Sequence, residues 1–425
     1  MDNQRKDNLY NEKSIESLSP LEFTRLRPGV YAGDCTYSTQ LLVEIFSNAV
    51  DEFNAGHGSQ IDVTIEKDII SVRDYGQGFL PNSFRDDGKT ILEAAFSVLN
   101  TSGKYREDGS YEGTSLGSFG IGSKITTFLS HWLEVETYRE KDTEAIRFNE
   151  GVFDSRKVDK TTEKSGTLVT WQPSEEFFTH TEVEIGKIRS LFKTISCLCQ
   201  GLTINLSYNG TKEIFSSKNG LNDLVDEAVK DKEIIDNRLE VVSHEDKYSL
   251  NLVMTYTSNY SSTIVAYVNT GLTDTGAHIT QLKTTLTREM NKFFREKGWL
   301  KEKDENLTGD DIQEGLYVVF NYTAPAVGYD AQVKSRVTKI DTKPEISAFS
   351  SALTDWLLVN EKEIKLIADK AINARKAREA AKKAREAVRE SKEKKKDKVI
   401  KFDSKLSDCY SKDRMKCEIY ITEGK

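Results

Sequence analysis

Several common features are missing from this sequence of 425 residues, and each absence argues against a class of protein. There is no run of about eighteen apolar residues, which a transmembrane helix requires. The first residues, MDNQRKDNLYNEKSIES, are polar and contain no apolar core of the kind that a secretory signal needs. A mean hydropathy of −0.54 and a charged fraction of 30% instead predict a soluble protein without a membrane partner, and cysteines interpreted as reduced predict a cytoplasmic one.

Cysteine and histidine are also scarce. The five cysteines form an odd set without the CxxC spacing of zinc sites, and we interpret them as reduced thiols. None of the five histidines lies in an obvious two-helix phosphoacceptor segment, which argues against a histidine kinase. The motif GxxxxGK[ST] is absent, so a P-loop ATPase is not supported. The net charge of −8 argues against a surface devoted to DNA, although a local basic patch remains open.

The most informative stretch is residues 41–52, LLVEIFSNAVDE. Glu44, Asn48 and Asp51 recur at spacings of four and three, which place side chains on one face of a helix. Apolar residues cover most of the remaining circumference, so we expect a largely buried helix. Taken alone, the pattern favours a polar network that is satisfied inside the protein. The alternative is a carboxylate that activates water and an amide that holds a metal ion.

Two glycine-rich segments follow this helix and favour the second interpretation. Residues 72–78, VRDYGQG, contain DxGxG after a β-hairpin pattern at 62–72. Residues 117–123, GSFGIGS, contain GxxGxG before another helical run. Each motif is weak evidence alone, but their order after the helix is much more specific. Together the three segments resemble the GHKL ATPase fold, which gyrase, Hsp chaperones, histidine kinases and MutL share.

The surrounding pattern predicts an α/β sandwich that ends near residue 218. The long polar segment 81–116, with a helix-like insert at 90–99, is typical of an active-site lid. The remaining expected elements are antiparallel strands at 133–138, 145–148 and 166–171, a helix at 183–202, and a strand at 202–208 that closes the sheet.

A second α/β unit is expected after residue 218. Its predicted elements are strands at 248–256, 262–268 and 315–321, a helix at 278–297, and one long helix from 343 to about 398. The later half of the long helix is rich in alanine and basic residues. This composition favours a solvated, salt-laced helix; the alternative is a rigid lever that passes near DNA phosphates.

Within the GHKL group, the chain most closely resembles the B subunit of bacterial type IIA DNA topoisomerases. The segments that carry this resemblance are LRPGVYAG, VEIFSNAVDE, EKSGTLVTWQPS, TGDDIQEGLYVVF, GYDAQVKSRV and KLSDC followed by CEIYITEG. The resemblance implies an α/β (α+β) chain: a GHKL (Bergerat) ATP-binding sandwich and a ribosomal-S5-like transducer domain with a long C-terminal helix. The implied boundaries are an arm at 1–20, the ATPase domain at 21–218, the transducer at 219–398 and the start of a TOPRIM domain at 399–425.

ATP hydrolysis needs a positioned water, a base, Mg²⁺ and donors for the phosphate charge. The resemblance implies that Glu44 is the catalytic base and that Asn48 is the Mg²⁺ ligand. Lys334 would reach the γ-phosphate from the transducer, with Gln332 orienting its loop. The other residues implied to bind the nucleotide, beside Asn48, are Tyr10, Asp51, Asp74, Gly76, Gly78, Lys104, Tyr111, Gly117, Ser118, Phe119, Gly120, Ile121, Gly122 and Thr167. Asp74 and Thr167 would contact adenine, and the glycine loop would cradle the phosphates.

The resemblance also implies partners. Tyr10 lies in an arm that would cap the nucleotide of a neighbouring protomer, so ATP should drive formation of a homodimer around double-stranded DNA. The DNA-cleaving A subunit would complete the enzyme. Because the sequence given stops at Lys425, this chain should hydrolyse ATP and dimerise without cleaving DNA by itself. Gln77 stands where the family often has arginine, which leaves open how inhibitors bind the adenine pocket. Gyrase and topoisomerase IV are not distinguished, and a MutL-like ATPase or a nucleotide-gated clamp is the alternative.

Overall fold

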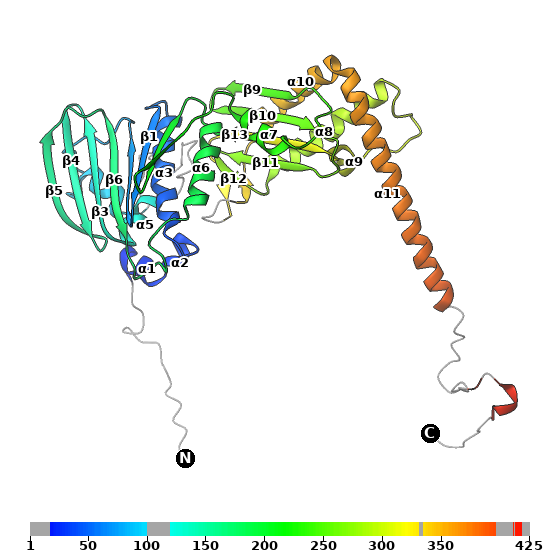
Figure 1. Ribbon diagram of the computed structural model, residues 1–425, viewed down its shortest axis with the longest axis horizontal. Coiled ribbons are helices and arrows are strands. Elements are labelled where there is room, and N and C mark those ends of the chain that lie inside the picture. Colours follow the sequence, from blue (N-terminus) through cyan, green and yellow to red (C-terminus); the bar gives the residue numbers. More distant parts are fainter. Residues whose placement is uncertain (1–17, 100–119, 331–334, 397–410, 412, 419–425) are drawn as a thin grey trace.

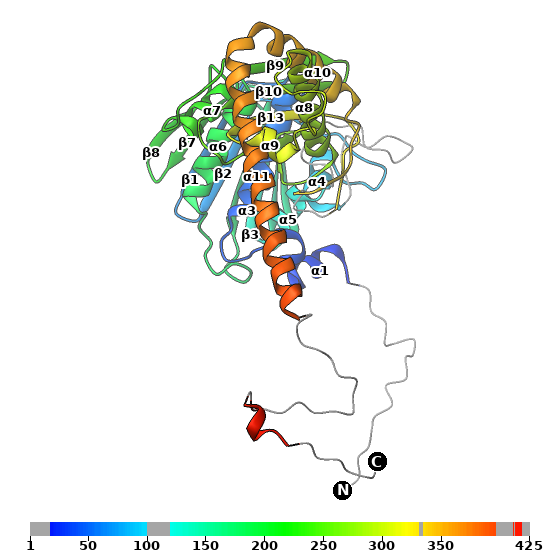
Figure 2. The same ribbon diagram turned by 90° about the vertical axis from the view of Figure 1, so that its right-hand side faces the viewer.

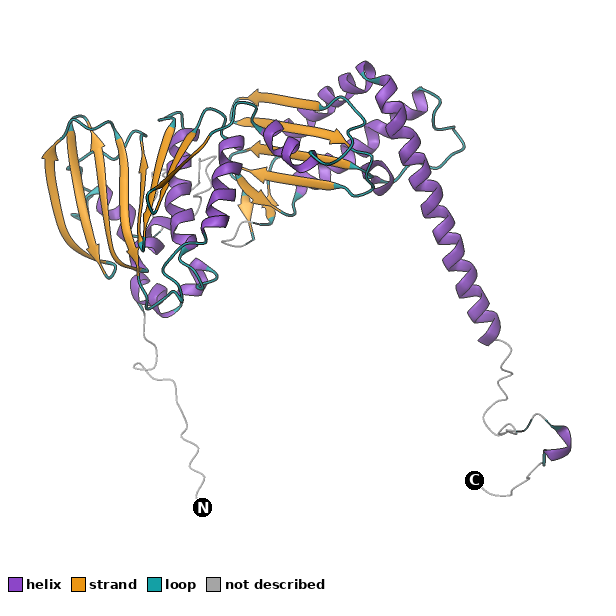
Figure 3. Cartoon of the chain, in the orientation of Figure 1, coloured by secondary structure: helices purple, strands orange, loops and turns teal. Residues whose placement is uncertain are grey.

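The computed structural model describes residues 18–99, 120–330, 335–396, 411 and 413–418. Figure 1 shows two sheet-containing units side by side and a long helix that leaves the second unit. Figure 3 shows the same arrangement as two large, separate sheets with helices between them. Among the described residues, no helix is both long and apolar enough to span a membrane.

The first unit is built on an eight-stranded sheet with the order β5-β4-β3-β6-β2-β1-β7-β8. Neighbouring strands are antiparallel, except that β1 and β7 are parallel. Buried and more accessible residues alternate along β1 and β2 because side chains point to opposite faces. The strands are β1 (Gln60–Glu66), β2 (Ile69–Asp74), β3 (Ser130–Arg139), β4 (Asp142–Asn149), β5 (Val152–Lys160), β6 (Gly166–Pro173), β7 (Thr203–Tyr208) and β8 (Thr211–Phe215).

Helices cover the inner face of this sheet. α3 contacts β1 and β2, α5 contacts β3 and β6, and α6 contacts β7 and β8. α3 follows the predicted pattern, since Leu42, Ile45, Phe46, Ala49 and Val50 are all buried. The helices of this unit are α1 (Pro20–Leu26), α2 (Pro28–Ala32), α3 (Thr39–Asn54), α4 (Ile91–Ser97), α5 (Gly122–Phe128) and α6 (Ile185–Leu198).

The sequence-based expectations for the middle of this sheet are confirmed, and those for its edges are not. The hairpin, the helix of the lid segment and the antiparallel strands lie where the pattern placed them. The strand at 202–208 does not close the sheet, because β8 pairs beyond it. At the opposite edge β5 was not predicted, since its residues are almost all exposed and show no alternation.

The second unit has a five-stranded sheet with the order β12-β11-β13-β10-β9, in which β11 and β13 are parallel. α7 and α6 lie on the side of the first unit, whereas α8 and α10 (Lys343–Val359) cover the other face. The polar edge strands β9 and β12 were not predicted. The remaining elements are α7 (Leu221–Val229), β9 (Leu239–Glu245), β10 (Tyr248–Tyr256), β11 (Thr263–Val268), β12 (Gly271–Thr273), α8 (Ala277–Glu296), α9 (Gly309–Gln313), β13 (Leu316–Thr323), β14 (Gly328–Tyr329), β15 (Val337–Lys339) and, near the end, the 3₁₀ turn η1 (Arg414–Lys416).

The prediction of one continuous helix from residue 343 was wrong. α10 ends at Val359 and α11 (Glu361–Lys396) begins after Asn360. The Asn360 side chain donates to the carbonyl oxygen of Trp356 at 2.9 Å and accepts from Nδ2 of Asn237 at 2.9 Å. The hydrogen bonds of the Asn360 side chain therefore compete with the backbone hydrogen bonds that would continue the helix. The break lets α10 pack on α8 while α11 turns away across α9.

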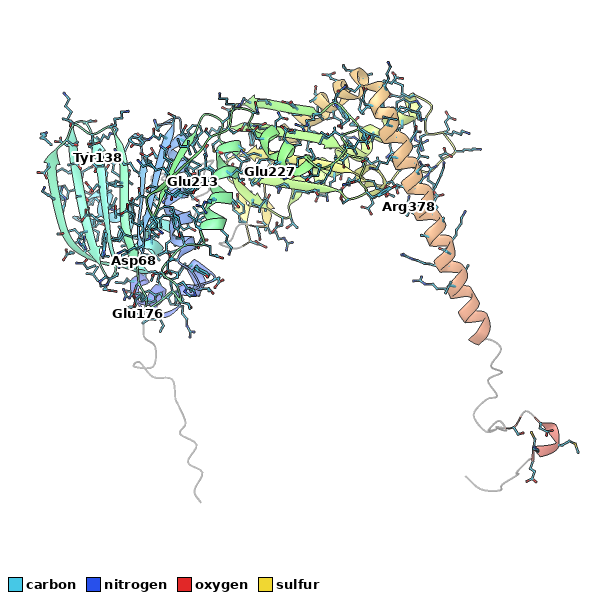
Figure 4. The ribbon with its side chains drawn as sticks, viewed as in Figure 1. Asp68, Tyr138, Glu176, Glu213, Glu227 and Arg378 are labelled. Atoms are coloured by element: carbon cyan, nitrogen blue, oxygen red, sulfur yellow. The ribbon has the colours of Figure 1, made fainter. Side chains whose placement is uncertain are left out.

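The free part of α11 projects beyond the second unit in both views (Figures 1 and 2). Arg378, labelled in Figure 4, lies where the helix leaves the body of the protein. The guanidinium donates from Nε to Oδ1 of Asp311 at 3.0 Å and from Nη2 to Oδ2 at 2.9 Å. Asp311 is buried and also forms a capping box with Thr308 at the start of α9. The bidentate pair therefore ties the long helix to the second unit.

Candidate functional site

The first two polar residues of the α3 pattern are more accessible than the apolar residues around them. Glu44 is half-buried and Asn48 is exposed, whereas the apolar residues between them are buried. Oε1 of Glu44 accepts a hydrogen bond from Nε2 of Gln40 at 2.7 Å. Sequence reasoning missed Gln40, although its position four residues before Glu44 is the spacing that brings side chains together on a helix. The uncharged amide of Gln40 therefore orients the Glu44 carboxylate without neutralising its charge.

The start of α5 lies directly against this carboxylate. A Cβ atom at Gly122 would overlap Oε2 of Glu44 and would lie 3.0 Å from its Cδ. A side chain at this position would displace the Glu44 carboxylate from where it lies, so the glycine lets the backbone approach that group closely. Gly120 has a φ of +59°, and the partly buried Ile121 packs against the core. These three residues bring the second half of the GxxGxG motif to Glu44.

Lys124 lies in the first turn of α5 and is buried. Burial lowers the pKa of its ammonium group to about 8, because the charged form is poorly solvated there. Asp51, the third polar residue of the α3 pattern, is buried as well. Burial raises the pKa of the neighbouring Cys199 thiol to about 12, and the charge of Asp51 acts in the same direction.

Asp74 stands at the end of β2 and is 8% exposed. Its Oδ1 accepts the backbone N–H of Gly76 at 2.9 Å and that of Thr167 at 3.2 Å. Neither of these bonds uses Oδ2. Burial raises the pKa of Asp74 to about 6, and the bond from Gly76 opposes the increase. The carboxylate is thus held rigidly, with one oxygen committed to the turn.

The glycines of the DxGxG motif fit a crowded turn. Gly78 has a φ of +66°, and a Cβ atom there would lie 2.8 Å from the carbonyl oxygen of Tyr138. The hydroxyl of Thr137 accepts the N–H of Phe79 at 2.7 Å and donates to its carbonyl oxygen at 3.1 Å. Thr137 was not singled out from the sequence. It pairs with Thr167 in the register of β3 and β6, so the turn is fastened to the sheet beside Asp74.

Several predicted site residues lie outside the described residues, so the structure does not test them. They are Tyr10, Lys104, Tyr111, Gly117, Ser118, Phe119, Gln332 and Lys334. Among the residues that are described, no group of three or more histidine, cysteine, aspartate or glutamate side chains could hold a metal ion. Magnesium binding by Asn48 stays a prediction, and so does a direct contact from the Thr167 hydroxyl, whose backbone N–H makes the bond to Asp74.

A second candidate surface runs along α8. A groove of about 630 Å³ is lined by basic and polar side chains from α8 and from the loop before α9. Arg288 lines this groove and also a neighbouring one of about 770 Å³ between α8 and α10. The basic side chains of the first groove are Lys283, Arg288, Lys292 and Arg295. Sequence reasoning had placed its basic candidate surface on α11 and missed this groove.

Comparisons with known proteins identify the family of this chain. Residues 220–387 match the family model described as DNA gyrase B. The chain is 36% identical over 430 residues to the B subunit of DNA topoisomerase 4 from Streptococcus pneumoniae, a match that includes 98% of this chain. It is 35% identical over 430 residues to the corresponding protein of Bacillus subtilis. The chain belongs to the B-subunit family of type IIA DNA topoisomerases.

Solved structures extend the comparison to the fold. The 43K ATPase domain of Thermus thermophilus gyrase B, crystallised with an aminocoumarin, superposes with a TM-score of 0.68 at 27% identity. That match covers 86% of this chain and 98% of the gyrase domain. The topoisomerase IV ATP-binding domain of Francisella tularensis, at 24% identity and a TM-score of 0.72, shares the fold. The expected fold class is therefore confirmed.

The curated relatives are longer than this chain. It spans 66% of the length of the Streptococcus protein and 64% of that of the Bacillus protein. The Thermus and Francisella structures, by contrast, are matched over 98% and 97% of their lengths. The chain therefore corresponds to the ATPase and transducer region of the family.

Proposed function

We propose that this chain is the ATP-hydrolysing, ATP-dimerised N-terminal gate of a type IIA DNA topoisomerase, acting in the cytoplasm. The observation that carries the proposal is the contact between the Glu44 carboxylate and Gly122, the first residue of α5. This contact brings a potential base to the segment whose backbone would hold phosphates. The free thiols Cys35, Cys197 and Cys199 suit a reducing compartment.

In this proposal Glu44 takes the proton of the attacking water, and Gln40 keeps the carboxylate oriented. The exposed Asn48, one turn further along α3, offers a neutral oxygen to Mg²⁺. When bound, the metal ion would neutralise phosphate charge. Lys334, supported by Gln332, contacts the γ-phosphate from the transducer side.

The base of the nucleotide binds at the other end of α3. Oδ2 of Asp74 accepts a hydrogen bond from the amino group of adenine, while Oδ1 remains bonded to Gly76 and Thr167. Specificity follows because a nucleotide with a carbonyl in place of that amino group would face the carboxylate with another acceptor. The same pocket is the proposed site for inhibitors, with Gln77 exposed at its edge.

Dimerisation and DNA capture involve the outer surfaces. Residues 1–20 act as the arm that crosses to the second protomer, where Tyr10 caps the nucleotide. Residues 21–218 form the ATPase domain, 219–398 the transducer and 399–425 the start of a TOPRIM domain. The basic groove on α8 contacts the phosphates of a captured duplex, because its lysines and arginines lie together on one face. The DNA-cleaving A subunit completes the enzyme.

Turnover measurements on the wild-type chain and on Glu44→Ala test the hydrolytic part of the proposal. The wild-type chain should hydrolyse ATP in a phosphate-release assay. Glu44→Ala should bind a non-hydrolysable ATP analogue with wild-type affinity and show no turnover. Normal hydrolysis by the variant would refute the assignment of Glu44, and a wild-type chain that binds ATP without turnover would instead be a nucleotide-gated clamp.

Light scattering tests the gate. The chain should be a dimer at saturating concentrations of the analogue, and a version that lacks residues 1–20 should dimerise more weakly. A wild-type chain that remains monomeric with bound analogue would refute the gate while leaving the ATPase assignment intact.

A further inference from the structure

Two carboxylates hold the turn that follows β2, and the proposed adenine contact uses one of them. Oδ1 of Asp74 accepts the N–H of Gly76 at 2.9 Å, and Oε2 of Glu52 accepts the next N–H, that of Gln77, at 3.2 Å. Glu52 belongs to the last turn of α3 and is half-buried. Two successive backbone N–H groups of one turn therefore bond to different elements, the first to a carboxylate of β2 and the second to a carboxylate of α3.

The packing around this turn leaves little freedom. A Cβ atom at Gly76 would lie 2.6 Å from Oε2 of Glu52 and 2.9 Å from its Cβ and Cγ. Just after α3, Gly58 has a φ of +74°, and a Cβ atom there would lie 2.6 Å from the carbonyl oxygen of Tyr75. The last turn of α3 and the loop that follows it thus contact the turn after β2 at two points. A shift of that helix end would move the backbone beside Asp74.

We propose that Glu52 is a positioning residue of the nucleotide site, which holds the backbone of Gly76 and Gln77 against α3 and sets a second negative charge beside Asp74. This inference rests on the proposed function, because it assumes that Asp74 contacts adenine. Glu52 itself need not touch the nucleotide. It acts through the shape of the turn and through the charge that Asp74 experiences.

The electrostatic part follows from the groups that surround Asp74. The charged groups acting on it are Glu52 from α3 and Arg73 from its own strand, while β6 and β3 contribute the neutral Thr167 and Thr137. The pKa of Asp74 is raised to about 6, mainly by burial, and the charge of Glu52 contributes to that increase. A proton on Asp74 therefore competes with the adenine amino group near pH 6. Removal of the Glu52 charge should move that competition to lower pH.

Glu52→Gln separates charge from contact, because the amide oxygen still accepts the N–H of Gln77. In the nucleotide-free chain, the carboxyl ¹³C NMR signal of Asp74 should titrate with a lower midpoint than in the wild type. At pH 8 the variant should bind a non-hydrolysable ATP analogue with wild-type affinity. Between pH 8 and pH 5.5 the wild type should lose roughly fourfold in affinity and the variant less. An unchanged midpoint would overturn the electrostatic part of the proposal.

Glu52→Ala removes the acceptor as well as the charge. Its affinity for the analogue at pH 8 should fall about three- to tenfold, the usual effect of losing one hydrogen bond, and wild-type affinity there would overturn the positioning role. Glu163→Gln is the matched control, since this exposed carboxylate lies in the loop before β6 and is not among the main groups that shift the pKa of Asp74. It should behave as wild type in both assays. A wild-type chain that binds no analogue would refute the proposed function, whereas the NMR titration would still decide the coupling of Glu52 to Asp74.

Discussion

Replacement of Glu345 by glutamine should make the stability of the protein less sensitive to rising pH. Glu345 lies in the first turn of α10, and its side chain is completely buried. Neither carboxyl oxygen has a hydrogen-bond partner. Its surroundings include Tyr248 and Tyr322, whose rings stack at 6.3 Å, and a cavity of only about 10 Å³. Because an ionised carboxylate would be poorly solvated here, burial raises the pKa of Glu345 well above its ordinary value of 4.5.

The sign of the effect follows from proton linkage. Below pH 4.5 the carboxyl is protonated in both the folded and the unfolded chain, so ionisation contributes nothing to the free energy of unfolding. Above that value the unfolded chain loses the proton and the folded chain keeps it. Each pH unit in this interval lowers the free energy of unfolding by about 1.4 kcal/mol. The loss stops once the pH passes the raised pKa of the folded state.

The Glu345→Gln variant has no such proton to lose. The difference in free energy of unfolding between variant and wild type should therefore grow in favour of the variant, with a limiting slope of about 1.4 kcal/mol per pH unit. Urea unfolding followed by circular dichroism at a series of pH values measures this difference. Asp355→Asn, at an exposed carboxylate of the same helix, should show no comparable slope. Parallel curves for Glu345→Gln and the wild type would refute the reasoning.

Three further predictions concern the site and the long helix. Gln40→Ala should lower kcat about tenfold with little change in KM, because Glu44 loses the donor that orients it; unchanged kcat would remove Gln40 from the mechanism. Arg378→Ala should lower the free energy of unfolding by about 1–2 kcal/mol in urea titrations, since it leaves a buried carboxylate without its bidentate partner. Lys292→Glu should weaken binding of duplex DNA and flatten its dependence on salt in anisotropy titrations. The same reversal at Lys160, on the edge strand of the first sheet, should leave DNA binding unchanged.

The local sequence pattern was sufficient to predict an element where its buried and functional residues recur with a regular period. α3 was predicted because its apolar residues repeat with a helical period, and that period also placed Glu44 and Asn48 on one side. Asp74 was identifiable because it ends an alternating strand and opens a glycine-rich turn. These residues lie in short continuous segments, so no knowledge of distant contacts was needed.

The local sequence pattern did not predict the edge strands of the first sheet or the break between α10 and α11. β5 and β8 carry few buried residues, and an edge strand that faces solvent has no reason to alternate. The long helix appeared continuous because its composition contains few breakers. The decisive bond at Asn360 comes from Asn237, which is distant in the sequence. Helix propensity is a local property and does not include the effect of such a tertiary contact.

The amino-acid sequence by itself therefore determined the order of the motifs, the central elements of both units and the side chains expected to carry the chemistry. Only the tertiary structure decided what those side chains experience. Gly122 lies against Glu44, Glu52 accepts a hydrogen bond from the turn after Asp74, and the buried Glu345 carboxyl has no hydrogen-bond partner. Each of these environments arises because segments far apart in the chain pack together. The charge, solvation and orientation of a group depend on those neighbours, and a period read along one strand or helix carries no information about them.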